Sequence, residues 1–136
     1  MSEEGVTHIT AEELNKWFVK GGNNFVIVDL RREDYLKGHI KGSWNVPVTG
    51  QMTEADLHIL MKRLENYRHL KEITTLNIIF HCSSSKNRGP RVAKQFATYL
   101  AQEGETGNYQ STVLVNGYTG WKQECDKNND TSLIAF

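Results

Sequence analysis

Apolar residues along the chain follow two alternating patterns, one typical of helices and the other of buried strands. Thr10 and Glu13 form a capping-box signature, and apolar residues then recur at helical spacing until Gly21. A short continuous apolar run, 25–28, follows and ends at Asp29, as expected for a strand buried on both faces of a sheet. The first part of the chain therefore predicts a helix followed by a buried strand.

The same alternation continues toward the C-terminus. Thr53 opens a second helical stretch with an apolar stripe, and the segment 76–80 returns to strand character. Pro90 suits the first turn of a third helix, which Gly104 is expected to end. The apolar run 112–115 then predicts the last buried strand.

Strands that alternate with helices in this order predict an α/β fold, in which a parallel sheet carries helices on both faces. Ligands bind to such sheets beyond the carboxyl ends of the strands, where the polar loop 81–87 is expected to lie. With 136 residues and 38% apolar content, we expect a single domain, 1–136. The polar stretches 1–6 and 127–131 are expected to be frayed ends.

The composition argues against several classes of function. The 16 basic and 16 acidic side chains cancel, so no overall field favours a nucleic acid or an acidic membrane. No segment approaches the roughly 20 apolar residues of a membrane span, and Glu3 and Glu4 stand where a signal peptide would be apolar. Cys82 and Cys125 are too few for a disulfide framework, and no Cys/His spacing suggests a metal. We therefore expect a cytoplasmic protein without a bound cofactor.

The segment 81–88, with the sequence HCSSSKNR, carries the candidate chemistry. It joins a buried strand to a helix, so consecutive backbone N–H groups can form an anion-binding nest at the positive end of the helix. Lys86, Arg88 and the helix N-terminus favour thiolate over thiol at Cys82, which is the expected nucleophile. The guanidinium of Arg88 matches two oxygens of a tetrahedral anion and is the expected substrate clamp.

The remaining loop residues are candidates for binding the oxyanion. The hydroxyl groups of Ser83, Ser84 and Ser85 either donate to the thiolate or the bound anion, or belong to ordinary loop residues. Lys86 and Asn87 complete the expected oxyanion-binding stretch.

Two residues outside the loop have a possible supporting role. His81 is expected to act at most as a support for Cys82, since a histidine in this position is more often a hydrogen-bonding scaffold residue. Asp29 either pairs with Arg31 or a loop amide, or transfers a proton directly, and the first role is favoured. Cys125 is either a resolving thiol or a structural residue, and the second reading is favoured.

Beyond these patterns, the chain resembles a known superfamily. Cys82 to Arg88 follows the Cys-x5-Arg pattern shared by protein tyrosine phosphatases and the rhodanese-related M-phase inducer phosphatases. The segments 28–31, 38–43, 46–47 and 115–118, together with Tyr35 and Trp121, resemble the rhodanese superfamily. Within it, the segments 28–34, 46–49, 80–82 and 85–90 are most similar to the fungal arsenate reductases. The resemblance spans most of the chain. It implies a rhodanese-like three-layer α/β/α fold with a central, mainly parallel five-stranded sheet and an active loop at 82–88.

The resemblance also implies a reaction. In the fungal arsenate reductases, the cysteine that matches Cys82 attacks arsenate, the arginine that matches Arg88 holds it, and glutathione and glutaredoxin supply electrons. The implied function is therefore arsenate reduction with glutathione as cosubstrate. These reductases carry glycine at the position of Ser84, so a Cβ there would alter the nest if this residue requires positive φ.

Three other functions stay open on the sequence. A phosphatase would form a phosphocysteine at Cys82, but the loop 83–87 holds no carboxylate, and the nearest candidates for a general acid are Asp29, Glu33 and Asp34. A sulfurtransferase is a weaker reading, because rhodanese sulfurtransferases typically have a loop one residue shorter. A non-catalytic module that binds a phosphorylated partner would need no reactive cysteine. The oligomeric state is also open, with a homodimer as one option.

Overall fold

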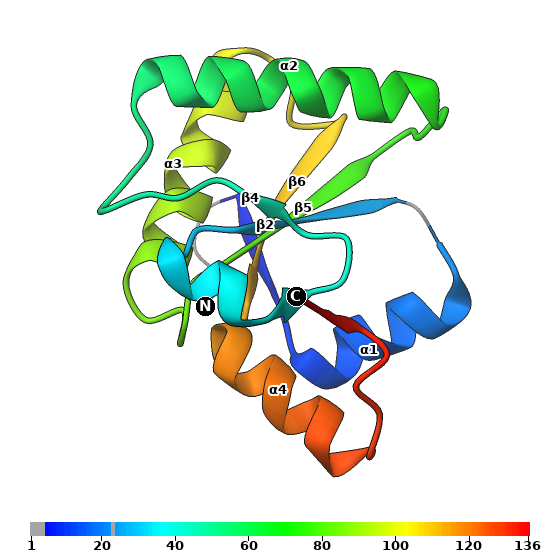
Figure 1. Ribbon diagram of the computed structural model, residues 1–136. Coiled ribbons are helices and arrows are strands. Elements are labelled where there is room, and N and C mark those ends of the chain that lie inside the picture. The colour runs from blue at the N-terminus through cyan, green and yellow to red at the C-terminus, as the bar shows by residue number, and fades with distance from the viewer. Residues whose placement is uncertain (1–4, 23) are drawn as a thin grey trace.

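The computed structural model describes residues 5–22 and 24–136. Within these residues, five strands form one parallel sheet in the order β1-β6-β5-β2-β4, so that β5 lies at its centre (Figure 1). The strands are β1 (Val6–Ile9), β2 (Phe25–Asp29), β4 (Trp44–Asn45), β5 (Leu76–His81) and β6 (Tyr109–Leu114). A separate antiparallel pair joins β3 (His39–Ile40) to β7 (Ile134–Ala135).

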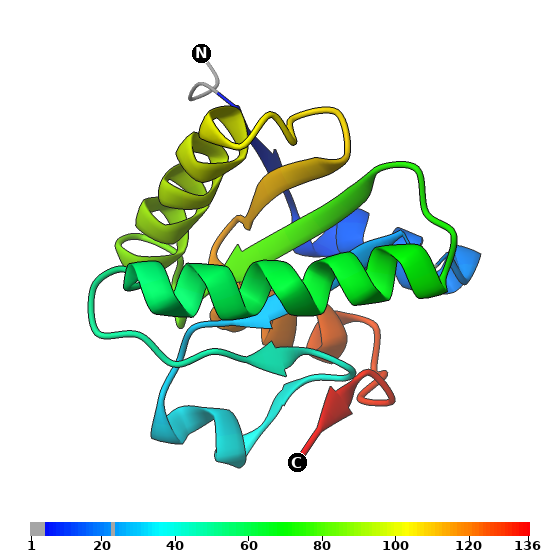
Figure 2. The same ribbon diagram turned by 90° about the horizontal axis from the view of Figure 1, so that it is seen from above.

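Helices cover both faces of this sheet. On one face lie α2 (Glu54–Leu70) and α3 (Arg88–Gln102), and on the other lie α1 (Ala11–Lys20) and α4 (Gly117–Lys127) (Figures 1 and 2). The expected three-layer α/β/α architecture with a five-stranded sheet is therefore confirmed, and all strand pairs described in this sheet are parallel.

The continuous apolar runs of the central strands follow from this double cover. Val26 and Val28 of β2 pack in the cluster beneath α2 and α3, whereas Ile27 packs against α1 and α4. In β5, Phe80 and Ile79 divide between the two faces in the same way. Because successive side chains of a strand point to opposite faces, a sheet buried on both sides requires apolar residues at every position.

Most of the predicted boundaries agree with the structure. Thr10 caps α1 in a capping box with Glu13, and Gly21 closes this helix with φ 74°. Thr53 caps α2 by accepting a hydrogen bond from a backbone amide. The predicted last strand begins three residues earlier than expected, at Tyr109, because pairing with β5 extends it.

The expectation of frayed ends is wrong for the described residues. Val6 is 3% exposed and begins β1, which pairs with β6. Lys127 is the last residue of α4, residues 128–129 form a turn, and the amide of Asp130 donates to the carbonyl of Cys125 before the chain continues to β7. Residues 1–4 of the predicted N-terminal tail lie outside the described residues. In the part of the chain that the structure describes, no helix has the length and apolar character needed to cross a membrane.

Candidate active site

The loop 82–87 leaves the central strand β5 and leads directly into α3. Its first residue, Cys82, is 4% exposed. The neighbouring strands β2 and β6 run parallel to β5, so their carboxyl ends lie at the same edge of the sheet. The segments that follow them, among them the 3-10 helix η1 (Glu33–Lys37) and the start of α4, therefore begin at the edge of the sheet where the loop lies.

The first two carbonyl groups of the loop are bound by the N-terminus of α4. The Cys82 carbonyl accepts a hydrogen bond from the amide of Tyr118 at 3.0 Å, and the Ser83 carbonyl accepts one from the amide of Thr119 at 2.9 Å. Gly117 has φ 54°, and a Cβ at this position would lie 2.8 Å from the Ser83 carbonyl oxygen and closer still to that of Cys82. Glycine at this position therefore permits the close approach of α4 to the loop.

The backbone amides of the loop are free, in contrast to these carbonyls. Within residues 5–22 and 24–136, no backbone or side-chain group accepts a hydrogen bond from the N–H groups of residues 83–88. Six consecutive N–H groups without a partner at the N-terminus of a 15-residue helix are donors that an anion could accept from. The predicted nest is thus equipped with free donors next to Cys82.

The side chains of the loop differ in exposure. Ser83, Ser84 and Arg88 are half-buried, whereas Lys86 and Asn87 are exposed. The guanidinium of Arg88 forms no hydrogen bond or ion pair with any described residue. All residues proposed from the sequence to bind the oxyanion lie in the loop between β5 and α3 or, in the case of Arg88, at the first position of α3.

Ser84 does not meet the condition under which its Cβ would alter the nest. The left-handed residue of the loop is Ser85, with φ 55°, and Ser84 is not among the described residues with positive φ. The Cβ of Ser84 therefore adds no left-handed strain to the nest. Ser85 has a cost instead, since left-handed geometry disfavours a side chain by about 1 kcal/mol. Its Oγ is buried and has no hydrogen-bond partner among the described residues.

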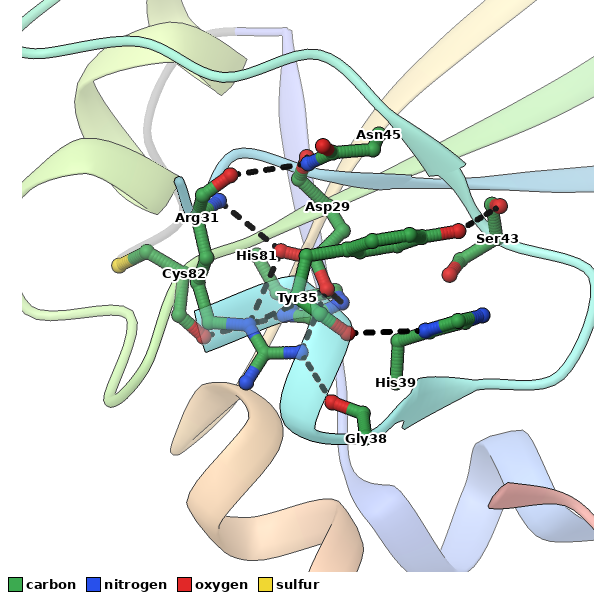
Figure 3. A network of polar contacts seen from close by, with 9 residues as sticks. All are labelled: Asp29, Arg31, Tyr35, Gly38, His39, Ser43, Asn45, His81 and Cys82. Atoms are coloured by element: carbon green, nitrogen blue, oxygen red, sulfur yellow. Dashed lines mark hydrogen bonds and ion pairs between the residues drawn. The ribbon is translucent and has the colours of Figure 1, made fainter. Parts of the chain in front are cut away.

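A buried ion pair lies behind the loop (Figure 3). The carboxylate of Asp29 accepts hydrogen bonds from Nε of Arg31 at 3.1 Å and from its Nη2 at 2.8 Å, and also from its backbone amide at 2.9 Å. Nη2 donates as well to the carbonyl of Gly38 at 2.8 Å. Of the two roles left open for Asp29, the structure therefore shows the pairing with Arg31.

His81 links this pair to the backbone of Cys82. It lies opposite Asp29 in the register of β2 and β5 and is fully buried. Its Nδ1 lies 3.0 Å from the Cys82 carbonyl and donates to it, while its Nε2 lies 3.7 Å from the Asp29 carboxylate, too far for a hydrogen bond. Burial lowers the pKa of His81, and this effect exceeds the opposing effects of the Asp29 carboxylate and of the hydrogen bond to the Cys82 carbonyl. The neutral imidazole thus helps to fix the Cys82 peptide group.

Cys125 lies in a different environment. It is buried beside Trp121 in the apolar cluster between α1, α4 and the sheet. Burial raises the pKa of the Cys125 thiol, and Asp130 and Asp126 raise it further. Because Cys125 follows Gly117 by eight residues of α4, it lies roughly 12 Å along the helix from the loop. The structural reading of this cysteine is therefore favoured.

The sequence reasoning missed the contribution of the α4 N-terminus to the site. Asn116 and Gly117 have φ 64° and 54°, and an Asn-Gly pair shortly after a strand is a signal for such left-handed geometry. The ring of Tyr118 lies 4.0 Å beneath the guanidinium of Arg31, a cation–π contact that joins α4 to the buried ion pair. Among the described residues, no group of three or more His, Cys, Asp and Glu side chains is placed to hold a metal ion.

Comparison with known proteins places this architecture in a family. Residues 10–124 match the family described as the Rhodanese-like domain. The chain belongs to the rhodanese-like domain family. This rhodanese-like chain is 41% identical to Arsenical-resistance protein 2 of Saccharomyces cerevisiae, over 96% of its own length and 98% of the relative.

Solved structures of rhodanese-like proteins have the same fold. A Saccharomyces cerevisiae homolog of single-domain rhodanese and the Cdc25 phosphatase catalytic domain superposes with a TM-score of 0.71 and 28% identity, covering 96% of this chain and 88% of the other. The As-Sb reductase from Leishmania major superposes with a TM-score of 0.74 and 24% identity, covering 95% and 84%. The resemblance to the rhodanese superfamily and to its phosphatase relatives is thereby confirmed.

Proposed function

We propose that this protein is an arsenate reductase with Cys82 as its nucleophile and Arg88 as its substrate clamp. The observation that carries the proposal is the division of hydrogen bonds in the loop: the carbonyls of Cys82 and Ser83 are bound by α4, and the amides of 83–88 are free to bind an oxyanion. The 41% identity to an arsenical-resistance protein of yeast supports arsenate as that oxyanion.

The first step forms a bond between the Cys82 sulfur and arsenic. The free loop amides and Arg88 neutralise the arsenate oxygens during the attack. One arsenate hydroxyl leaves as water and takes with it the proton that the Cys82 thiol has released. Arsenic remains in the +5 state in this adduct, so no electrons have yet been transferred.

The second step requires another thiol. We propose that glutathione attacks the Cys82 sulfur: a disulfide bond forms, the S–As bond breaks, and its electron pair reduces arsenic to the +3 state. The glutathione proton passes to an oxygen of the departing arsenite. Exchange of the mixed disulfide with a further thiol, through glutaredoxin, restores Cys82 and yields oxidised glutathione. This cycle needs a reducing compartment, which is consistent with a cytoplasmic location.

The same loop fits a phosphatase, which is the second candidate because a structural relative is a homolog of the Cdc25 phosphatase catalytic domain. When the Cys82 sulfur attacks a phosphate ester, the alkoxide leaves as the phosphocysteine forms, and its departure requires a proton from a general acid. The loop 83–87 contains no carboxylate, Asp29 is committed to Arg31, and Glu33 and Asp34 lie exposed on η1. Because the departing arsenate oxygen also takes up a proton, it is the 41% identity to an arsenical-resistance protein that ranks arsenate reduction first.

One experiment separates the two activities. Purified protein is assayed for arsenite formation with arsenate, glutathione and glutaredoxin, and in parallel for hydrolysis of an aryl phosphate. We expect arsenite formation by the unmodified protein, none by Cys82→Ser, and a loss of at least about 100-fold for Arg88→Ala, since the arginine binds charge that develops in the transition state. Hydrolysis of the phosphate without arsenite formation would transfer the assignment to a phosphatase.

Two matched variants control for unspecific damage. Cys125→Ser removes the other thiol, and Arg91→Ala removes an exposed arginine that lies about one helical turn beyond Arg88 in α3. Both variants should retain arsenite formation. If Cys125→Ser abolishes the reaction while Cys82→Ser does not, the nucleophile has been assigned to the wrong residue.

A further inference from the structure

The first two amides of the active loop are directed by the carbonyls that precede them. A trans peptide group is planar, so its C=O and its N–H point in opposite directions. The Cys82 carbonyl faces α4, because it accepts a hydrogen bond from the amide of Tyr118. The Ser83 amide, which shares this peptide group, therefore points away from α4. The Ser84 amide does so as well, since the Ser83 carbonyl accepts a hydrogen bond from the amide of Thr119.

The loop carbonyls in turn cap the first turn of α4. Its N-cap residue, Asn116, makes no side-chain hydrogen bond to this turn. The carbonyls of Cys82 and Ser83 take the place of such a cap, so the loop and the first turn of α4 hold one another. Trp121 and Cys125 anchor α4 in the core, but they lie about one and two turns further along the helix. A contact that fixes the first turn of α4 therefore also fixes the loop.

A buried guanidinium makes such a contact with the first turn of α4. Nε and Nη2 of Arg31 donate to the carboxylate of Asp29, and Nη2 donates also to the carbonyl of Gly38. The N–H bonds of a guanidinium lie in its plane, so these hydrogen bonds leave its flat face free. The ring of Tyr118 packs against this face, with its centroid 4.0 Å from Cζ. Tyr118 thus joins Arg31, through its ring, to the Cys82 carbonyl, through its amide.

Arg31 contacts the loop from the side opposite to the nucleophile. In Figure 3, the Cys82 carbonyl lies toward the Arg31 side chain, whereas the Cys82 sulfur points away from it. An oxyanion attacked by this sulfur therefore lies on the far side of the loop from Arg31. The effect of Arg31 on the reaction is indirect, through the orientation of the loop amides.

Given the proposed function, on which this inference rests, we propose that Arg31 and Tyr118 are positioning residues for oxyanion binding. The stacked pair fixes the first turn of α4, and this turn directs the amides of Ser83 and Ser84 toward the oxyanion. The role requires the ring of Tyr118 but not its hydroxyl group. It also requires the flat face of a guanidinium, which the point charge of a lysine does not offer.

The test measures arsenate binding without turnover, by calorimetry in the Cys82→Ser background. Tyr118→Leu removes the ring and should weaken arsenate binding by about tenfold, because the cation–π contact is lost. Tyr118→Phe keeps the ring and should bind arsenate as the Cys82→Ser protein does. Arg31→Lys keeps the charge without the flat face and should also weaken binding. Combining Arg31→Lys with Tyr118→Leu should cause no further loss, because both substitutions remove the same contact.

A second cation–π pair provides the matched control, and hydrogen exchange measures the positioning directly. The guanidinium of Arg63 in α2 lies 3.8 Å from the ring centroid of Trp44 in β4, so Arg63→Lys removes a contact of the same kind and should leave arsenate affinity unchanged. The amides of residues 118 and 119 donate to the loop carbonyls. Without any oxyanion, these amides should exchange with solvent about tenfold faster in Tyr118→Leu, but not in Tyr118→Phe or Arg63→Lys.

This inference and the proposed function can fail separately. Equal arsenate affinity of Tyr118→Leu and Tyr118→Phe would refute the positioning role, and so would a loss of affinity without faster exchange at residues 118 and 119. The reductase assignment would still stand if the unmodified protein forms arsenite. If affinity and exchange change as expected but no arsenite is formed, the positioning role stands and the reductase assignment is refuted. If the Cys82→Ser protein binds no arsenate, both proposals are refuted.

Discussion

The close contact between α4 and the active loop makes Gly117→Ala the most informative substitution outside the proposed chemistry. Gly117 has φ 54°, and left-handed geometry costs alanine about 1–2 kcal/mol. The new Cβ would also lie 2.8 Å from the Ser83 carbonyl oxygen and overlap that of Cys82. Because these are backbone atoms, relief requires movement of the loop, which we estimate at a further about 1–3 kcal/mol. The total loss of unfolding free energy is therefore about 2–5 kcal/mol.

Gly104→Ala is the matched control for this substitution. Gly104 has a comparable φ of 69°, but no atom lies within 4 Å of the position that its Cβ would occupy. It should therefore show only the left-handed cost of about 1–2 kcal/mol. Urea denaturation followed by tryptophan fluorescence measures both variants, and arsenite formation at a temperature where both are folded measures the loop. Only Gly117→Ala should lose activity as well as stability.

Two results would refute this reasoning. If Gly117→Ala and Gly104→Ala lose the same unfolding free energy, the contact between α4 and the loop carbonyls does not constrain the structure. If Gly117→Ala is strongly destabilised but its folded form keeps full activity, the position of the free amides does not depend on the docking of α4.

Other substitutions test the buried network and the two thiols. Asp29→Asn leaves the Arg31 guanidinium without its counter-ion and should lower the unfolding free energy, measured in urea, by about 3 kcal/mol. Burial lowers the pKa of His81 below its model-compound value of 6.5, so the unfolded state binds a proton that the folded state lacks; stability should fall as pH drops below about 6.5, and His81→Asn should flatten this slope. Iodoacetamide at neutral pH should label Cys82 before Cys125, whose pKa is raised by burial, and equal labelling would contradict the assignment.

The sequence by itself determined the local elements and the loop that carries the nucleophile. Thr10 and Thr53 begin helices in the structure, and the apolar runs 25–28 and 76–80 lie in the two strands at the centre of the fold. These features depend on residues a few positions apart, through capping hydrogen bonds and the alternation of side chains. The Cys-x5-Arg spacing likewise keeps Cys82 within six residues of Arg88, where α3 begins.

Only the tertiary structure decided which groups surround that loop. The register of β2 against β5 sets Asp29 opposite His81, and the docking of α4 binds the carbonyls of Cys82 and Ser83. The contact between the Arg31 guanidinium and the ring of Tyr118 also joins segments that lie far apart in the chain. The short strand β1 was missed for the same reason, since its four residues become a strand only by pairing with β6. Contacts between segments that are remote in sequence leave no periodic pattern of apolar and polar residues. The sequence therefore does not predict them, and they are known only from the way the elements pack in the structure.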